Sequence, residues 1–378
     1  MHILIAPNAF KHAIDARGAA MAIERGLLSS KLSCTCECFP VGDGGNGTGK
    51  LIVERIGGQL KATQVKDPLG RLMPATFGIA GQVAVVELAE ASGLHLLEPN
   101  ELNPLLANSY GTGQLITAAL DSGATEILLC VGGSATVDGG SGILTALGVR
   151  FLDEMGSEIT ELPLGLERLH TIDCSQMDRR LRNCRLMVLC DVSNPLIGSD
   201  GAAVTFGPQK GATPAEVGRL ASILERFATT IAEMTGHSIA RMVSGGAAGG
   251  VAAGLAGLLN AELVSGIDYF LQLTHFEMAL AKSNLVITGE GSIDLQTIGG
   301  KAPLGVAKLA KKVGCPVVAL AGSVPVEQEP ALENYFDIVL AIGNGPTTLV
   351  EALLTTASDL ERVGRQIGNF VAVATGVT

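Results

Sequence analysis

Residues 2–28, HILIAPNAFKHAIDARGAAMAIERGLL, contain the unit from which the fold of this chain is predicted. The apolar run His2–Ala6 has no regular alternation with polar residues, which is typical of a strand buried on both faces. Asp15 is a suitable N-cap for a helix over Asp15–Leu28. A strand followed by a helix in this way is the first half of a parallel βαβ unit.

The same alternation continues along the chain. Further apolar runs of strand length are Val83–Leu88, Glu126–Val131, Leu186–Val192, Leu285–Thr288, Pro316–Ala321 and Ile338–Ile342. Another helix is predicted over Ala302–Val313, with Pro303 in its first turn. The pattern predicts an α/β fold. Because both ends of the chain alternate most regularly, we predict one discontinuous domain of residues 1–62 plus 285–378 and a second α/β domain of residues 63–284, with approximate boundaries.

The composition fits a globular enzyme. Of the 378 residues, 47% are hydrophobic and 17% are charged, which excludes a disordered chain. The net charge of −11 argues against sequence-independent binding to nucleic acid. The uncharged stretch 244–261 is rich in Gly and Ala, so we interpret it as a loop that leads into a buried helix and not as a membrane span.

The start of the chain and its cysteines indicate a cytoplasmic protein. Met1 leads directly into an apolar strand, so no signal peptide is predicted. The eight cysteines include no C-x-x-C pair, and Cys34, Cys36 and Cys38 alternate along one face of a predicted strand. A reduced, half-buried strand is favoured over a zinc site.

Residues 42–51, GDGGNGTGKL, resemble two nucleotide-binding motifs but satisfy neither. A Walker A loop would need Ser or Thr where Leu51 stands. A dinucleotide fingerprint would need a ribose-binding acid about twenty residues on, and the candidate, Asp67, lies in the turn KDPLG. Amides at the start of the next helix could hold an anion, with Asp43 binding a metal or accepting a proton. A glycine-rich connection capped by Asp43 is equally compatible with the sequence.

Further stretches carry other candidate residues. Residues 131–142, VGGSATVDGGSG, offer amides, hydroxyls and Asp138 for a phosphate and Mg²⁺. Asp191 ends an apolar run and suits either a general base or an Asx turn. The glycines of 243–250, VSGGAAGG, suit either a phosphate or close helix packing. Lys301 near a predicted helix start is opposed by the helix dipole, which favours an anion beside it.

In order and spacing, these motifs resemble those of the bacterial type I glycerate kinase family, the glycerate 2-kinases. The matching stretches are IAPNAFKHAIDA, DGGNGT, NPLLANSYGTGQLI, VGGSATVDGGSG, CDVSNPLIGSDGAAVTFGPQKGA, GGAAGG and ITGEGSIDLQT followed by GGK. The resemblance implies phosphorylation of D-glycerate by ATP with Mg²⁺, giving 2-phosphoglycerate. It also implies a flavodoxin- or Rossmann-like domain with a parallel sheet, a mixed α/β domain, and an active site in the cleft between them. It identifies DGGNGT as a family element and not a Walker A loop.

The resemblance and the residue chemistry together give the candidate site. The catalytic candidates are Asp191, as base on the substrate hydroxyl, Lys11 and Asp294. Substrate or phosphate binding is assigned to Asn8, Gly44, Gly45, Ser134, Asn194 and Lys301, nucleotide binding to Gly132, Gly133, Gly245, Gly246, Gly249 and Gly250, and metal binding to Asp43, Asp138 and Glu290. The expected ligands are ATP, Mg²⁺ and D-glycerate, with no nucleic acid and no membrane, and a homodimer is left open.

Departures from the family's usual motifs keep the substrate open. Asn8, Asn46, Val137 and Ser292 stand where the family usually has Asp, Glu, Asn and Arg. Ser292 cannot supply the bidentate recognition of carboxylate or phosphate that Arg would give, so a related small hydroxy acid is an alternative substrate. Two further hypotheses are a nicotinamide-dependent oxidoreductase that uses the glycines from Gly42, and a non-catalytic nucleotide-binding family member.

Overall fold

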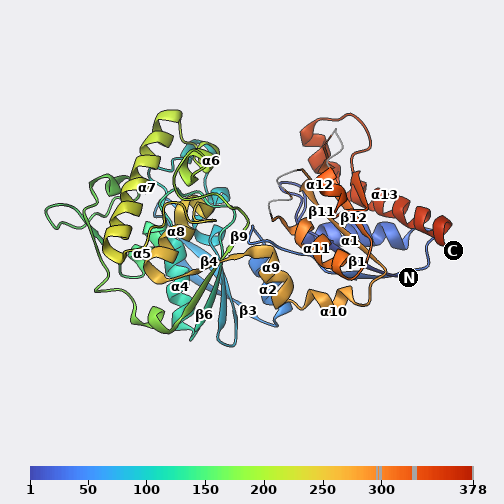
Figure 1. Cartoon of the computed structure of the whole chain (residues 1–378), viewed down its shortest axis with the longest axis horizontal. Coiled ribbons are helices and arrows are strands. Elements are labelled where there is room, and N and C mark those ends of the chain that lie inside the picture. Colours follow the sequence, from blue (N-terminus) through green and yellow to red (C-terminus); the bar gives the residue numbers. More distant parts are fainter. Residues whose placement is uncertain (295–296, 298–299, 326–329, 377–378) are drawn as a thin grey trace. The chain divides into compact units, whose positions relative to one another are not determined.

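The computed structural model describes residues 1–294, 297, 300–325 and 330–376. The chain forms two compact units, each described here by itself. Unit 1 comprises Met1–Asp43 and Ile267–Thr378, and unit 2 comprises Gly44–Gly266. Figure 1 shows that unit 1 is built from both ends of the chain. The two units divide at Asp43/Gly44 and at Gly266/Ile267, earlier in the chain than the predicted domain boundaries at 62/63 and 284/285. The domain boundaries stay a prediction.

The described residues of unit 1 form a five-stranded sheet in the order β13-β12-β11-β1-β2. Every neighbouring pair is parallel. Counted along unit 1 alone, this order is 2-1-3-4-5, the order of flavodoxin-like doubly wound sheets. The strands are β1 (His2–Pro7), β2 (Thr35–Cys38), β11 (Leu285–Ser292), β12 (Val317–Ser323) and β13 (Ile338–Ala341). The prediction of a flavodoxin-like parallel domain is confirmed, and its topological switch point lies between β1 and β11.

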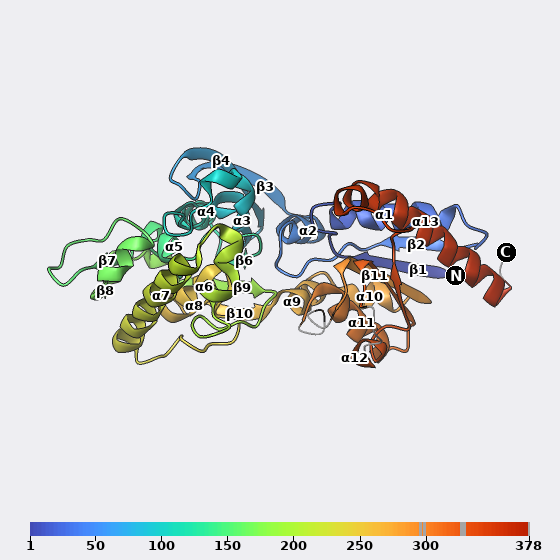
Figure 2. The ribbon, with the colours of Figure 1, turned by 90° about the horizontal axis from the view of Figure 1, so that it is seen from above.

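Helices cover both faces of this sheet (Figure 2). On one face α1 (Ala16–Leu28) and α13 (Leu349–Thr375) pack on Ile3, Ile5 and Leu320. As predicted, Asp15 is the N-cap of α1, and its side chain accepts a hydrogen bond from Gly18 N at 2.7 Å. On the opposite face lie α11 (Ala302–Lys312) and α10 (Phe276–Leu280). The remaining helices described in this unit are α12 (Pro330–Glu333) and α9 (Gly266–Leu273), and α9 begins at the last residue of unit 2.

Unit 2 is the mixed α/β unit that the sequence analysis predicted. Its main sheet has the order β10-β9-β6-β5-β4-β3, in which β10, β9, β6 and β5 are parallel and β4 and β3 are antiparallel additions. Because the carboxyl ends of the four parallel strands meet at one edge, the loops that follow them lie close together. The strands are β3 (Gln59–Lys66), β4 (Leu72–Ala80), β5 (Val83–Glu87), β6 (Glu126–Cys130), β9 (Arg185–Cys190) and β10 (Glu262–Ser265), with a separate pair β7 (Arg150–Leu152) and β8 (Thr171–Asp173).

Helices and one large apolar core stabilise unit 2. The core joins Val86, Leu129 and Val188 of the sheet to Phe227 and Val251 of the helices. The α-helices are α2 (Thr48–Arg55), α3 (Ala89–Ser92), α4 (Tyr110–Asp121), α5 (Ser141–Ala146), α6 (Ala202–Phe206), α7 (Pro214–Thr235) and α8 (Ala247–Leu259), and the 3₁₀ turns are η1 (Leu94–Leu96), η2 (Pro99–Glu101), η3 (Leu164–Arg168), η4 (Arg179–Asn183) and η5 (Pro208–Lys210). The predicted buried helix within 244–261 is α8.

We expect Gly254→Ala to destabilise unit 2 by about 3 kcal/mol or more, because overpacking a rigid backbone contact is costly. A Cβ at Gly254 would overlap the carbonyl oxygen of Gly139. Gly218→Ala in α7 is the matched control, since its Cβ would meet no atom within 4 Å. The control should be neutral or stabilise the helix by about 0.5–1 kcal/mol. Urea unfolding of both variants measures the difference. Equal stability of the two variants would contradict the close contact between Gly254 and the Gly139 carbonyl oxygen.

Candidate active site

In unit 1 the predicted polar residues gather at the carboxyl ends of β1 and β11. Asn8 follows β1, and its amide group donates a hydrogen bond to Asp43 Oδ2 at 2.9 Å. Glu290 lies on β11 and accepts a hydrogen bond from Thr297 Oγ1 at 3.1 Å. Lys301, the N-cap residue of α11, places its Nζ 3.8 Å from Glu290 Oε1. The switch point of the sheet therefore holds two carboxylates and a cation, where doubly wound folds bind ligands.

Glu290 is buried, with 8% of the residue exposed. Its burial raises the pKa to about 7, and the charge of Asp43 adds to this effect. Lys301, Lys11 and the Thr297 hydroxyl lower the pKa without cancelling the effect of burial. A carboxyl group that titrates near neutrality can exchange a proton or take up a cation under physiological conditions.

Lys11 and Asp294 complete the predicted set in unit 1. Lys11 is exposed in the turn after β1, and its charge reaches Glu290. The main-chain amide of Asp294 donates to Thr297 Oγ1 at 3.2 Å, and Ser292 Oγ lies 3.4 Å from Asp294 Oδ2. The predicted motif ITGEGSIDLQTIGGK is described only in part, since residues 295–296 and 298–299 lie outside the described residues.

In unit 2 the structure brings together three loops that carry predicted residues, namely 132–139, 191–200 and 244–250. Gly246 N donates to Asn194 O at 2.8 Å, and Gly139 N donates to Gly249 O at 3.0 Å. The Asn194 side chain donates to Asp200 O at 2.8 Å, which fixes the middle loop. Asp191 directly follows β9 in that loop and is half-buried. Candidates far apart in the sequence thus lie on adjoining loops.

The glycines of these loops mainly allow close backbone packing. The amides of Gly132, Gly245, Gly246 and Gly250 donate to the carbonyl oxygens of Gly44, Met242, Asn194 and Gly246, respectively. These amides are therefore already used within the protein, which supports the packing alternative, and a role of these glycines in nucleotide binding stays a prediction. A Cβ at Gly133 or Gly249 would overlap Asn46 or Thr136, so these two positions also require glycine. For Gly133 and Gly249 a role in nucleotide binding stays a prediction.

The opening glycine loop does not offer α2 to an external anion. Gly47 N and Lys50 N donate to the Glu87 carboxylate at 2.8 and 3.1 Å. Glu87 ends β5, and burial raises its pKa while these amide bonds lower it. Gly44 N donates to Thr48 Oγ1 at 3.1 Å. An internal carboxylate occupies the helix start that could otherwise hold an anion, and the phosphate contacts of Gly44 and Gly45 stay predictions.

Asp138 is fully buried at 0% exposure and acts as a structural acceptor. Its carboxylate accepts hydrogen bonds from Ser109 N at 2.9 Å, Ser109 Oγ at 2.7 Å, Gly140 N at 3.0 Å and Gly142 N at 3.1 Å. These bonds tie the 132–142 loop to the start of α4. Because Oδ2 accepts three of these bonds and Oδ1 accepts one, the carboxylate has a clear structural role, and metal binding by Asp138 stays a prediction.

We expect Asp138→Asn to lower the free energy of unfolding by about 2–4 kcal/mol. The NH2 group of asparagine is itself a donor and would face the groups that donate to the carboxylate in this buried site. Asp121→Asn is the control, since its carboxylate is 64% exposed in an ion pair with Arg180. Such a surface pair contributes no more than about 1 kcal/mol. Denaturant unfolding of both variants tests this role, and an Asp138→Asn variant as stable as Asp121→Asn would refute it.

Sequence reasoning missed Lys210, although it lies in the stretch FGPQKGA that was part of the family resemblance. The side chain is 2% exposed, and Nζ donates to Ser134 Oγ and to Thr136 O, both at 2.7 Å. Burial lowers the pKa of Lys210 to about 7, although the charge of Asp138 opposes this shift. A buried lysine is rare enough to mark a site, but no local pattern in the sequence shows that this one is buried.

Two other features raised by the sequence do not form sites. Asp67, the ribose candidate, accepts hydrogen bonds from Leu69 N and Arg71 N at 2.9 and 2.8 Å and so organises the β3–β4 turn. Cys36 and Cys38 are half-buried, and burial raises the pKa of each thiol to about 12. Within the described residues no group of three or more His, Cys, Asp and Glu side chains is placed to hold a metal ion.

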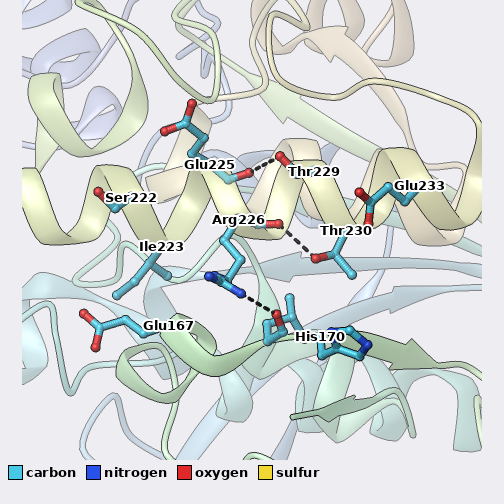
Figure 3. A pocket seen from close by; sticks show the side chains of 10 residues that line it. Glu167, His170, Ser222, Ile223, Glu225, Arg226, Thr229, Thr230 and Glu233 are labelled. Carbon is cyan, nitrogen blue, oxygen red and sulfur yellow. Dashed lines mark hydrogen bonds between the residues drawn. The ribbon is translucent and has the colours of Figure 1, made fainter. Parts of the chain in front are cut away.

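A cavity of about 630 Å³ lies between α7 and the η3–β8 segment of unit 2. Figure 3 shows Ser222, Glu225 and Glu233 on α7, with Glu167 and His170 opposite. The Arg226 side chain crosses this space and donates to Leu169 O at 3.0 Å. None of the candidate residues lines the cavity, so the cavity is separate from the predicted site.

Comparisons with known proteins show the family of this chain. Residues 3–372 match the model of the Glycerate kinase family. The chain belongs to this family. It is 44% identical to a glycerate kinase of Halalkalibacterium halodurans, with 97% of each chain covered. It is 40% identical to glycerate 2-kinase of Escherichia coli K12, covering 99% of this chain and 98% of the relative. Both similarities span essentially the whole chain.

A solved structure shows the same family fold. The crystal structure of a presumed glycerate kinase 2 from Salmonella typhimurium LT2 has a TM-score of 0.83 and 40% identity, covering 100% of this chain and 99% of that chain. The family resemblance and the fold class predicted from the sequence are therefore confirmed. Within the part of the chain that the structure describes, no helix has the length and apolar character needed to cross a membrane.

The four departures from the family's usual motifs have clear local settings. Asn8 donates to Asp43, which an aspartate could do only when protonated. Asn46 lies beside Gly133, and Val137 is fully buried in the core. Ser292 lies beside Asp294. Asn8 and Ser292 thus adjoin Asp43 and Asp294 of unit 1.

Proposed function

We propose that this protein phosphorylates D-glycerate with ATP and yields 2-phosphoglycerate. The observation that carries the proposal is its full-length similarity to proteins named glycerate kinase and glycerate 2-kinase. Phosphoryl transfer needs positioned groups that neutralise charge and a base beside the acceptor hydroxyl. The candidate residues of both units include charge-neutralising groups and carboxylates that could act as the base.

In unit 1 we assign Lys11 and Lys301 to the negative charge of phosphate or of the glycerate carboxylate. Lys301 stands at the N-terminus of α11, where its own charge is unfavourable and an anion is favoured. Asn8 is assigned to substrate contacts, and Asp294 is kept as a catalytic candidate, a second base. The positive charges of Lys301 and Lys11 act on Glu290 and so limit the electrostatic cost of bringing anionic groups into this site.

Asp43 and Glu290 are the residues that would hold Mg²⁺. Both residues are 8% exposed, and they lie close enough for the charge of Asp43 to raise the pKa of Glu290. Mg²⁺ is commonly bound by one or two carboxylates together with substrate phosphates and water, so this donor set fits the ion. When bound, Mg²⁺ would neutralise charge on the transferred phosphoryl group.

In unit 2 we assign Asp191 as the base on the acceptor hydroxyl, with Ser134 and Asn194 as ligand contacts. Asp191 stands at the carboxyl end of β9, the edge at which α/β sheets place such groups. We also propose a cytoplasmic location. We propose no nucleic-acid partner, because a net charge of −11 disfavours binding to phosphate backbones. A homodimer stays a prediction.

The proposal is tested by ADP release from MgATP with D-glycerate and a panel of small hydroxy acids, followed by NMR of the product. D-glycerate-dependent release with phosphorus–proton coupling at C2 is expected. Release with another acid only would show that Asn8 and Ser292 accompany a changed substrate. Release with none of the acids, from protein that binds ATP, would refute the proposed activity and support a non-catalytic family member.

A further inference from the structure

The contact between Lys210 and Ser134 has a chemical consequence for the candidate site. Lys210 Nζ donates to Ser134 Oγ and to the main-chain oxygen of Thr136 at 2.7 Å each. A protonated lysine donates hydrogen bonds and accepts none. Ser134 Oγ must therefore be the acceptor in this pair, and its own hydrogen is directed to some other acceptor. Among the described residues, the hydrogen bonds of Ser134 Oγ include no such acceptor.

The charge near Ser134 decides which kind of ligand suits it. A buried ammonium group hydrogen-bonded to the serine oxygen disfavours a metal cation on that oxygen by repulsion. The same ammonium polarises the serine O–H and makes it a better donor to a negative oxygen. A bound anion would in turn favour the protonated form of Lys210. The pair thus favours an anionic oxygen beside Ser134.

We infer that Lys210 is a positioning residue that orients the Ser134 hydroxyl as a hydrogen-bond donor to an anionic oxygen of the ligand. This inference rests on the proposed function, which supplies two such oxygens, a phosphate oxygen and the carboxylate of D-glycerate. Packing alone does not require a lysine at this place, since methionine would fill a similar volume without burying a charge. Lys210 acts through Ser134 and does not itself touch the ligand.

A double-mutant cycle tests the inference. Calorimetry measures binding of inorganic phosphate and, separately, of D-glycerate to wild type, Ser134→Ala, Lys210→Met and the double variant, at about pH 6 where Lys210 holds its proton. For the same anion, each single change should weaken binding by about 10- to 100-fold, the effect of one charge-assisted hydrogen bond. The double variant should bind within about threefold of the weaker single variant. Loss confined to phosphate or to glycerate identifies which anion Ser134 contacts.

Lys61→Met and Ser122→Ala are the matched controls, because Lys61 Nζ donates to Ser122 Oγ at 3.1 Å on an exposed surface. Both controls should bind as wild type. Multiplicative effects of the two single changes would overturn the inference, since Lys210 would then act independently of Ser134. Unchanged binding in Ser134→Ala would also overturn the inference, and this variant answers the question even if Lys210→Met fails to fold. A wild-type protein that binds neither anion would overturn it as well. A coupled loss of binding in protein without D-glycerate kinase activity would refute the proposed function and leave this inference standing.

Discussion

Replacing Glu290 by glutamine is expected to lower turnover by about 100-fold or more, the loss typical of removing a group that transfers a proton or stabilises developing charge. Glu290 is buried at the switch point beside Asp43 and Lys301, and the proposed function uses its carboxylate for Mg²⁺. Glutamine has nearly the same shape and can still accept the hydrogen bond from Thr297. The variant therefore tests the charge of Glu290 more than its packing.

The same substitution should change the pH dependence of stability. Burial raises the pKa of Glu290 from its ordinary value of 4.5 to about 7. Since the native state holds this proton more tightly than the unfolded chain, the contribution of Glu290 to stability is complete below about pH 4.5 and is lost as the pH rises through 7. The lost contribution is at most about 3 kcal/mol. Glu290→Gln lacks this titration, so its stability relative to wild type should increase between pH 4.5 and 8.

Urea unfolding at several pH values in the presence of EDTA measures this difference without bound metal. Glu361→Gln is the control, because its carboxylate is 44% exposed in an ion pair with Arg25. The control should keep wild-type turnover and a wild-type pH profile of stability, within about 1 kcal/mol. A Glu290→Gln variant whose stability difference from wild type is constant with pH would show that Glu290 does not titrate near neutrality.

The sequence predicts most of the buried parallel strands because burial on both faces is a local property, but it does not identify β3, β4, β7, β8 or β10. The runs His2–Ala6 and Glu126–Val131 agree with β1 and β6 to within one residue, and Asp15 caps α1 as expected. Polar residues placed just after such strands must meet at one edge when the strands are parallel. Asn8 and Glu290 are therefore brought together although they lie far apart in the chain.

Partners supplied by distant segments were not predictable from the sequence. Glu87 is the last residue of a strand, and nothing near it shows that it accepts hydrogen bonds from the first turn of α2. The glycines at Gly246 and Gly250 have the composition of an anion-binding loop, but their amides bond to protein carbonyls. Whether an amide or a carboxylate is left for a ligand depends on packing between segments, which local patterns do not encode.

Asp191→Asn is expected to lower kcat by about 10²- to 10⁴-fold, because the proposed base could no longer accept the proton of the substrate hydroxyl. Binding of ATP and D-glycerate, measured by calorimetry, should change less than about threefold, since asparagine keeps the size and most hydrogen bonds of aspartate. Asp200→Asn, in the same loop with a carboxylate that is 64% exposed, is the control and should turn over as wild type.

The two variants together separate the base from the metal ligand. If Glu290 binds Mg²⁺, higher Mg²⁺ concentrations should restore part of the activity of Glu290→Gln, because a weakened metal site is filled by mass action. Excess Mg²⁺ should not restore Asp191→Asn, because a missing proton acceptor is not replaced by the ion. Wild-type turnover in Asp191→Asn would exclude Asp191 as the base and transfer that role to a carboxylate of unit 1. Glu290, whose pKa is about 7, would then be the first candidate, since it can exchange a proton at neutral pH.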